Sequence, residues 1–385
     1  MKSGSSLNAC LTRRGWLVLT ASALSACGGG SGSGSATTSS LPGTGGTGIY
    51  AQGSIWGFGS VRVNGIKFDD TAATVQIDGQ AGKSSDLRLG MVAGIQGLRG
   101  ADATLAIANS IEVWSIAQGP VASSQPGQFT LAGMTLQTDS GTVFDGIAGG
   151  AALTPGLTVR VWGLQAAADG SRWTATRVAV VNATSIVSTG LVTSSGSQRF
   201  VNGLRITGTA VAGLTIGDLA RVQGMLSSAG TSLEVTSVKV LVANGGPPQQ
   251  GEAEIEGLVT AVLSTTRFTM GTVEVDATNA AFSPAGAKIT VGARLEAEGI
   301  WQNRVLKATK VEIEDSASAQ EIEIEAPIEA YTDLSNFVVR GQRCDATLAL
   351  FTKGTAADLK VGVQVKLRGV VTGSVLMVSR IEVDK

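Results

Sequence analysis

The sequence predicts an all-β protein, a tandem array of five small antiparallel β-barrels that follows a disordered signal and linker. One pattern recurs five times, about 60 to 75 residues apart: a glycine, six residues that alternate apolar and polar, and a second glycine. Glycine is abundant, at 52 of 385 residues, and proline is scarce at 8, which is typical of short strands joined by tight turns. The five copies are Gly90–Gly97, Gly156–Gly163, Gly217–Gly224, Gly292–Gly299 and Gly362–Gly369.

The first 27 residues resemble a bacterial lipoprotein signal peptide. Arg13 and Arg14 precede the short apolar run Trp16–Leu24, and Leu24–Cys27 resembles the lipobox at which such signals are cleaved. The resemblance implies acylation of Cys27, for example by palmitate. The apolar run is too short to remain as a membrane span, so we expect a lipid anchor.

Residues 28–48 are almost wholly Gly, Ser and Thr and predict a flexible tether. The lipoprotein resemblance favours the outer membrane, because Gly28 stands where an aspartate would retain the protein in the inner membrane. The paired arginines are compatible with Sec or twin-arginine export, and the sequence leaves open which face of the outer membrane is occupied.

The first copy shows the repeated unit most clearly. Strands are expected at 49–56, 60–63, 66–68, 74–77, 91–99 and 105–114, with a loop at 78–90 that holds one helical turn around Asp86-Leu87. Asn64-Gly65 predicts a two-residue hairpin turn, because both residues tolerate positive φ. Five or six strands in about 65 residues favour a closed barrel similar to the oligonucleotide/oligosaccharide-binding (OB) type without its usual helix, and a small β-sandwich shares the pattern.

The other copies follow the same plan, which sets the expected domain boundaries. After the signal peptide (1–27) and the linker (28–48), we number the predicted units 1 to 5. They span 49–115, 116–184, 185–246, 247–317 and 318–385. Units this small lie near the lower limit for independent folding, so contacts between neighbouring units are expected to stabilise them.

The stretch from Gly57 to Asp69, continuing to Asp78-Gly79, resembles the domain of unknown function 5666 family, which occurs in tandem in bacterial lipoproteins. The hairpin pair persists as Asn202-Gly203 and is altered in the other units. The resemblance covers most of residues 49–385. It implies a small all-β fold and an envelope location, and it implies no activity, cofactor or catalytic residue.

Composition argues against several kinds of chemistry. The chain has no histidine, which removes the commonest general base and metal ligand, and no phosphate-binding loop or dinucleotide motif is present. We therefore expect no cofactor, no metal and no catalytic residue. The 29 basic residues face 30 acidic ones, so nucleic acid is not an expected partner.

Three residues of unit 1 are candidates to face a ligand: Trp56, Asp69 and Asp78. Tryptophan can stack on sugars or bases. Asp69 follows the hairpin, where it could bind calcium or cap a turn. A calcium site in every unit would need a carboxylate at this position, whereas several residue types can cap a turn. Turn capping is favoured, because the counterparts of Asp69 are Gln137, Thr207, Asp276 and Asp345.

Three further sets of residues are expected to be structural. Cys344 occupies the position of Phe68 and predicts a core residue. The remaining tryptophans of the folded part (Trp114, Trp162, Trp173 and Trp301) fall at non-equivalent positions, which favours packing. Two glutamate trios open units 4 and 5, and a solvated strand face is favoured over a stripe for cations or a basic partner. The trios are Glu252-Glu254-Glu256 and Glu321-Glu323-Glu325.

Together these features predict a lipid-anchored envelope protein that acts as a binding or structural module and is not an enzyme. A polysaccharide or a protein is the expected partner, and the oligomeric state is left open. The alternative is a carboxylate-dependent, glycan-active enzyme of the envelope with two acidic residues across a groove. Nothing in the spacing of the carboxylates singles out such a pair.

Overall fold

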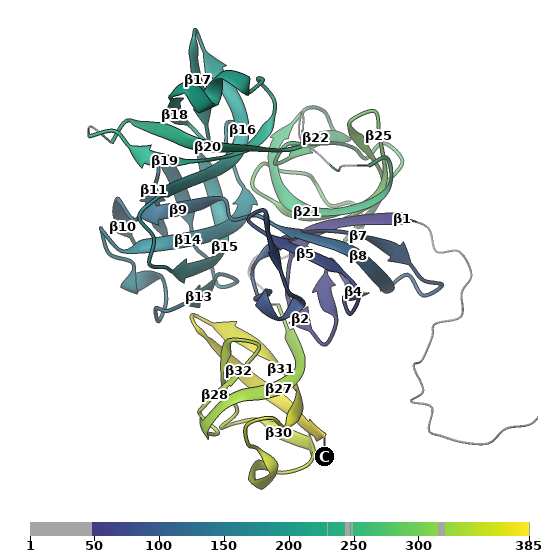
Figure 1. The fold of residues 1–385 in the computed structure, drawn as a ribbon. Coiled ribbons are helices and arrows are strands. Elements are labelled where there is room, and N and C mark those ends of the chain that lie inside the picture. Colours follow the sequence, from purple (N-terminus) through teal and green to yellow (C-terminus); the bar gives the residue numbers. More distant parts are fainter. Residues whose placement is uncertain (1–47, 229, 243–246, 248, 315–319, 385) are drawn as a thin grey trace, which may run out of the picture. The chain divides into compact units, whose positions relative to one another are not determined.

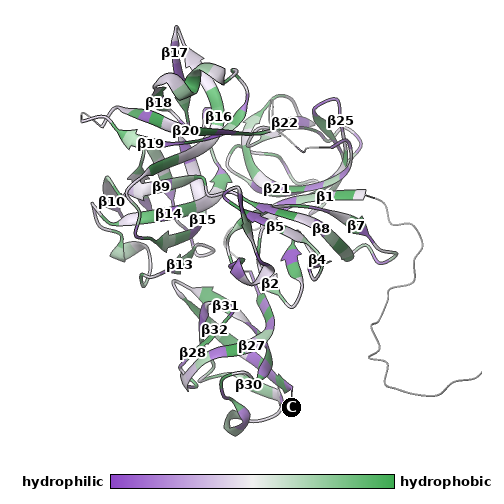
Figure 2. Cartoon of the chain, in the orientation of Figure 1, coloured by the Kyte–Doolittle hydropathy of each residue, from purple (hydrophilic) through white to green (hydrophobic). Residues whose placement is uncertain are grey.

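The computed structural model describes residues 48–384 except 229, 243–246, 248 and 315–319. The predicted signal peptide, Cys27 and nearly all of the predicted linker lie outside the described residues. The described part is all-β, as predicted, and its helical elements are four short 3-10 turns (Figure 1). Apolar and polar residues alternate along the strands (Figure 2), so that each strand buries one face.

Unit 1 forms a small closed barrel. Strand β7 pairs antiparallel with both β1 and β8, and β8 pairs parallel with β4. Strands β3 and β4 form the predicted hairpin, and β3 also pairs with β2, which continues the opening strand. The strands are β1 (Gly48–Ser54), β2 (Gly57–Phe58), β3 (Val61–Val63), β4 (Ile66–Asp69), β5 (Thr74–Ile77), β6 (Gln80–Gly82), β7 (Val92–Arg99) and β8 (Leu105–Val113).

The expected loop at 78–90 holds the short strand β6 in addition to a 3-10 turn, η1 (Ser84–Asp86), at the place of the predicted helical turn.

Unit 2 repeats the pairing of unit 1. It contains β9 (Ala117–Pro120), β10 (Ser123–Gln125), β11 (Gln128–Leu131), β12 (Met134–Gln137), β13 (Val143–Asp145), η2 (Gly150–Ala152), β14 (Thr158–Gln165) and β15 (Arg172–Val180).

Units 3 to 5 follow the same order. In every unit the second strand of the hairpin runs parallel to the last strand of the unit, which we call the closing strand. Unit 3 has β16 (Ile186–Ser195), β17 (Gln198–Val201), β18 (Leu204–Thr207), η3 (Thr209–Gly213), β19 (Leu219–Leu226) and β20 (Ser232–Val242). Unit 4 has β21 (Gly251–Val262), β22 (Arg267–Met270), β23 (Val273–Asp276), β24 (Ala281–Ser283), β25 (Arg294–Gln302) and β26 (Val305–Ile313). Unit 5 has β27 (Ile322–Asp333), β28 (Asn336–Val339), β29 (Gln342–Asp345), β30 (Leu350–Lys353), η4 (Ala356–Asp358), β31 (Gln364–Thr372) and β32 (Val375–Asp384). The small-barrel architecture is confirmed, and the domain boundaries stay predictions.

Both glycines of the recurring pattern have a steric reason. The first glycine of each copy has a φ between 75° and 94°, a region that favours glycine. The second glycine faces the closing strand at a β-bulge, where an added Cβ would overlap a carbonyl oxygen of that strand. The bulges lie at Gly97, Gly163, Gly224, Gly299 and Gly369.

The hairpin prediction is also confirmed. Asn64 and Gly65 have φ values of 51° and 70°, as a type I′ turn requires. The Asn64 side chain donates from Nδ2 to the carbonyl oxygens of Gln52 (3.0 Å) and Glu254 (3.1 Å). It lies so close to Gly53 that a Cβ at that residue would overlap it, which explains the glycine in the opening strand.

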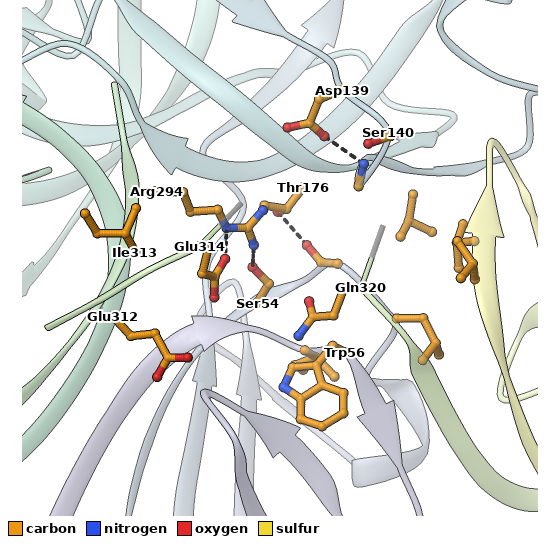
Figure 3. A pocket seen from close by; sticks show the side chains of 17 residues that line it. Ser54, Trp56, Asp139, Ser140, Thr176, Arg294, Glu312, Ile313, Glu314 and Gln320 are labelled. Carbon is orange, nitrogen blue, oxygen red and sulfur yellow. Dashed lines mark hydrogen bonds and ion pairs between the residues drawn. The ribbon is translucent and has the colours of Figure 1, made fainter. Parts of the chain in front are cut away.

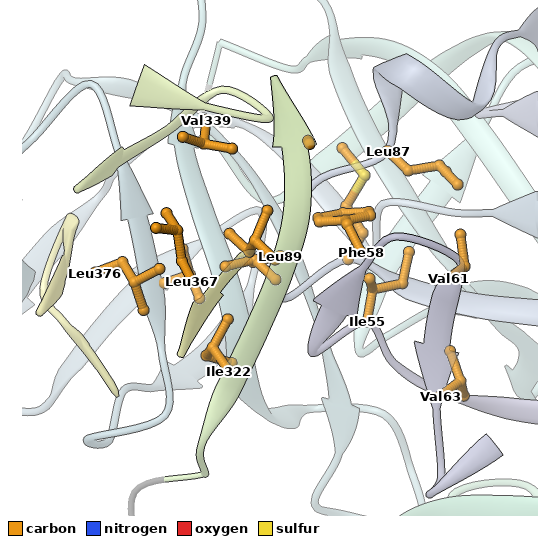
Figure 4. Close-up of a cluster of buried hydrophobic side chains, with 14 of the residues drawn as sticks. Ile55, Phe58, Val61, Val63, Leu87, Leu89, Ile322, Val339, Leu367 and Leu376 are labelled. Atoms are coloured by element: carbon orange, nitrogen blue, oxygen red, sulfur yellow. The ribbon is translucent and has the colours of Figure 1, made fainter. Parts of the chain in front are cut away.

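The apolar cores extend beyond the predicted units. One cluster contains residues of units 1 and 5, a second joins units 2 and 3, and a third lies in unit 4. Figure 4 shows part of the first cluster, with Phe58 and Leu89 from unit 1 and Leu367 from unit 5. Cys344 is fully buried in this cluster, and burial raises the pKa of its thiol to about 12, so the predicted packing role is confirmed.

Ladders between units explain these shared cores. Strand β1 pairs parallel with β21, β2 pairs parallel with β27, and β9 pairs antiparallel with β16. Units 1, 4 and 5 thereby share one 20-stranded sheet, and units 2 and 3 share a 12-stranded sheet. Contacts with neighbouring units were expected, but unit 1 also pairs with units 4 and 5, which are distant in the sequence.

The first glutamate trio lies against unit 1, so the solvated-face interpretation is wrong for it. Glu254 and Glu256 are 4% and 5% exposed. Arg99 of unit 1 pairs with Glu252 (3.0 Å), Glu254 (2.7 Å) and Glu298 (3.1 Å). Three carboxyl groups thus depend on one arginine from another unit, and the basic partner of this trio belongs to the chain itself.

The second trio contacts unit 1 in a similar way. Glu323 is 7% exposed and pairs with Arg62 of unit 1, with Arg368 at 2.8 Å and with Lys366 at 3.4 Å. Gly57 and Glu323 are partners in the β2–β27 ladder. The first trio and Glu323 of the second trio therefore hold their units to unit 1 by ion pairs, whereas Glu321 is exposed, as a solvated strand face predicts.

Candidate functional site

A cavity of about 390 Å³ lies where units 1, 2, 4 and 5 meet, and we call it the Trp56 cavity (Figure 3). Its wall combines one tryptophan with charged and hydroxyl side chains. The residues that bear on its chemistry are Trp56, Asp139, Arg294, Glu312 and Glu314. An aromatic ring beside several polar groups in a concave site is typical of sites for small polar ligands.

Neighbouring strands position the charged groups. Arg294 opens β25 and Glu314 follows β26, and the backbone N–H of Glu314 donates to the carbonyl oxygen of Arg294 at 3.0 Å. Their side chains therefore lie together, with Arg294 Nε 2.8 Å from Glu314 Oε2. Arg294 also donates to Ser54 Oγ (3.2 Å) and to Glu256 Oε1 (2.7 Å). One guanidinium thus serves two carboxylates and ties unit 4 to unit 1.

Glu314 is the cavity group whose proton affinity is most altered. Burial, and then the charge of Glu256, raise the pKa of Glu314 to about 7. Glu312 lies two residues earlier in the same wall. The cavity therefore contains a carboxyl group that can gain or lose a proton near neutral pH, close to further carboxylates.

A second pair of carboxyl groups lies on the adjoining strands. Burial, and then the charge of Glu296, raise the pKa of Glu254, and burial also raises the pKa of Glu296. The interaction between the two side chains raises the pKa of Glu254 further and lowers that of Glu296, as expected where two carboxyl groups share one proton. Two carboxyl groups that share one proton favour the folded state only while that proton is bound.

This pair predicts how stability depends on pH. A carboxyl with a raised pKa in the folded protein stabilises the fold fully below its unfolded pKa, and the contribution is lost as pH rises through the folded pKa. We expect the free energy of unfolding to fall by on the order of 1–3 kcal/mol between pH 5 and 8.5. Glu254→Gln keeps a donor for Glu296 and has no proton to lose, so its free energy of unfolding should fall less than that of the parent protein, as measured by urea unfolding. The fall that remains belongs to Glu314, whose raised pKa of about 7 lies in the same window.

The matched control is Glu274→Gln, which removes a carboxylate from the exposed pair with Arg267. It should follow the parent protein across the same pH range. Identical pH slopes for Glu254→Gln and the parent protein would contradict a shared proton.

The structure does not bring the three predicted ligand-facing residues together. Trp56 lines the cavity, and the Arg62 guanidinium lies 5.5 Å from its ring centroid. Asp78 accepts from Ser115 N at 2.8 Å and pairs with Arg221 (3.1 Å) and Arg160 (3.5 Å). Asp78 therefore joins units 1, 2 and 3, and ligand contact by any of the three residues stays a prediction.

Asp69 caps a turn, as the comparison of its counterparts favoured. Its Oδ1 accepts from Thr71 N (3.0 Å) and Thr71 Oγ1 (2.6 Å), and these bonds lower its pKa. Asp276 binds Thr278 in the same way, and Asp345 accepts from Thr347 N. The turn-capping interpretation is confirmed for these three aspartates.

The other tryptophans are mainly packing residues. Trp162, Trp173 and Trp301 are buried, and Trp114 is half-buried with Lys239 Nζ 4.9 Å from its ring centroid. Trp114 and Trp173 also line a second cavity of about 280 Å³ together with Tyr50. Burial raises the pKa of the Tyr50 hydroxyl well above its ordinary value.

Sequence reasoning missed the charged wall of the Trp56 cavity. Asp139, Arg294 and Glu314 come from two different units and carry no shared motif. The alternation in Val311–Glu314 was visible and places Glu312 and Glu314 on one strand face. This face lies near Trp56 because β1 pairs with β21. No local sequence pattern predicts that pairing.

Among residues 48–384 with the gaps given above, no three acidic or cysteine side chains are placed to hold a metal ion. Within the same residues, no helix has the length and apolar character needed to traverse a bilayer.

Comparison with known proteins supports the resemblance that the sequence showed. Residues 118–179 and 256–312 match the family model described as domain of unknown function (DUF5666). These regions fall in units 2 and 4. The chain matches no curated protein.

Proposed function

We propose that this chain, which carries domains of the DUF5666 family, is a non-catalytic binding protein of the bacterial cell envelope, anchored through a lipid on Cys27. Its ligand would be a segment of polysaccharide held in the Trp56 cavity. The observation that carries the proposal is that Trp56, Asp139, Arg294, Glu312 and Glu314 line one cavity of about 390 Å³. A sugar ring can stack on the indole while its hydroxyl groups bond to the charged groups.

Binding to an array of bacterial envelope glycans tests this function. We expect Trp56→Ala to weaken binding of any glycan that the mature protein retains by about 5- to 150-fold, because stacking contributes about 1–3 kcal/mol. Trp56→Phe should keep part of the affinity. Thermal unfolding of both variants separates a loss of binding from a loss of fold. Full affinity in a folded Trp56→Ala variant would remove the cavity as the site.

Anchoring needs its own test, because Cys27 lies outside the described residues. Radiolabelled palmitate should be incorporated by the full chain and not by Cys27→Ser, and the latter should appear in the soluble envelope fraction. Equal distribution of the two proteins would contradict the anchor.

A second candidate function rests on the pKa of Glu314. A carboxyl group with a pKa of about 7 next to Glu312 has the character of a general acid paired with a carboxylate, as in glycan-cleaving enzymes. Glu314→Gln would then abolish release of reducing ends from cell-wall glycans and leave binding intact. Absence of any release by the parent protein between pH 5 and 8 would remove this candidate.

A further inference from the structure

Unit 3 lacks one strand that the other four units have. In units 1, 2, 4 and 5, a short fourth strand pairs parallel with the second half of the closing strand. These fourth strands are β5, β13, β24 and β30. In unit 3 the corresponding segment, residues 208–218, is shorter than its counterparts and contains the 3-10 turn η3 and no strand.

The missing strand leaves one edge of β20 without a ladder. Strand β18 pairs with β20 at Ser232–Glu234, and beyond that point β19 is the ladder partner of β20 among the described residues. The turn η3 packs against β20 through half-buried Ala210 and Val211, but it adds no ladder. We call residues 237–241 of β20 the open edge. Unpaired strand edges are templates for another strand.

Side chains at the open edge are also less buried than their counterparts in the other units. Val238 aligns with residues of the other closing strands that are completely buried, whereas Val238 itself is half-buried. Those four residues are Ile111, Val178, Val311 and Ile381. Val240 is 42% exposed. In the other four units the fourth strand pairs with the residue that aligns with Val238, so at the open edge backbone groups and apolar surface are uncovered at the same place.

We propose that the open edge binds an extended segment of another polypeptide as an added parallel strand, with an aromatic or β-branched residue opposite Val238. The other units define this chemistry. Their fourth strands place an apolar side chain in register with the residue that aligns with Val238. The pairs are Val75–Ile111, Phe144–Val178, Phe282–Val311 and Phe351–Ile381. Main-chain bonds would supply affinity and this side chain would supply specificity.

The occupant is a different polypeptide and not a second copy of this chain. Each fourth strand of the chain is already held in its own ladder, so a second copy would have to pair β20 with β20 in antiparallel orientation. The four ladders of the other units are all parallel. Lys239, whose charge would otherwise discourage edge pairing, holds its ammonium group 4.9 Å from the Trp114 ring centroid.

Hydrogen exchange with a synthetic strand tests the proposal. The probe is a peptide of residues 141–147, Gly-Thr-Val-Phe-Asp-Gly-Ile, which contains β13. In the free mature protein, amides of residues 237–241 should exchange at least about 100-fold faster than those of the aligned residues 177–179 and 380–382. Millimolar peptide should slow them at least about tenfold, and a peptide with Asp in place of Phe144 should not.

Two variants separate the open edge from other apolar surface. Val240→Lys should abolish protection by the peptide, whereas Val262→Lys, at a valine that is also 42% exposed, should leave it unchanged. Slow exchange at residues 237–241 in the free protein would overturn the open edge. Failure of the peptide to protect these amides would overturn the strand-binding site. A dimer in sedimentation that Val240→Lys dissociates would show that the occupant is a second copy, which also overturns the proposal.

Discussion

Replacement of Arg99 by methionine is expected to lower the free energy of unfolding by about 3–5 kcal/mol at pH 7.5, because a buried ion pair that loses one partner leaves an uncompensated charge. Here one arginine serves the carboxylates of Glu252 and Glu298 and also contacts Glu254, which shares a proton with Glu296. Methionine retains much of the side-chain volume, so the loss reports charge more than packing. Urea unfolding followed by tryptophan fluorescence measures it.

The control for this substitution is Arg267→Met, which removes an arginine from a pair with Glu274 that is largely exposed. Surface pairs contribute about 0–1 kcal/mol, so this variant should remain close to the parent protein. The loss in Arg99→Met should also shrink at pH 5, where the carboxyl groups more readily take up protons. Equal losses in the two variants would show that the contact between units 1 and 4 does not depend on Arg99.

Gly299→Ala is expected to cost about 2–4 kcal/mol, through strain at a position that backbone atoms surround. A Cβ at residue 299 would overlap the carbonyl oxygen of Lys307 and press on the Cα of Ala308. Neither is the movable end of a side chain, so strands β25 and β26 must separate. Thermal and urea unfolding measure the loss.

Gly213→Ala is the matched control, because a Cβ at Gly213 meets no atom within 4 Å. Its effect should lie within about 0.5 kcal/mol of zero. A loss that small in Gly299→Ala would mean that the second glycine of the repeat is not sterically required.

The local structure could be predicted because its causes are local. Asn64-Gly65 favours a type I′ turn by its own conformational preferences, and alternation along a strand determines which face is buried. The second glycine of the repeat was recognised from its recurrence. Its reason, the approach of the closing strand at a bulge, needed the structure.

The site could not be predicted, because it is made by contacts between distant units. Glu254 and Glu256 alternate with apolar residues as any solvated strand face does, and their burial follows from the pairing of β21 with β1. The same ladder brings Arg294 to Ser54 and forms the wall of the Trp56 cavity. Of the three residues proposed from the sequence, Trp56 lines that cavity, whereas Asp69 and Asp78 make structural contacts.

The partnership of unit 1 with units 4 and 5 has a consequence for how the chain acquires its structure. Arg62 and Glu323, which meet across the β2–β27 contact, are 261 positions apart. Repeat proteins in which each repeat contacts only its neighbours can propagate order from either end. Here unit 1 is synthesised well before units 4 and 5, which supply its ladder partners β21 and β27. The described units should therefore fold slowly and together, and removal of unit 5 should destabilise unit 1 as well.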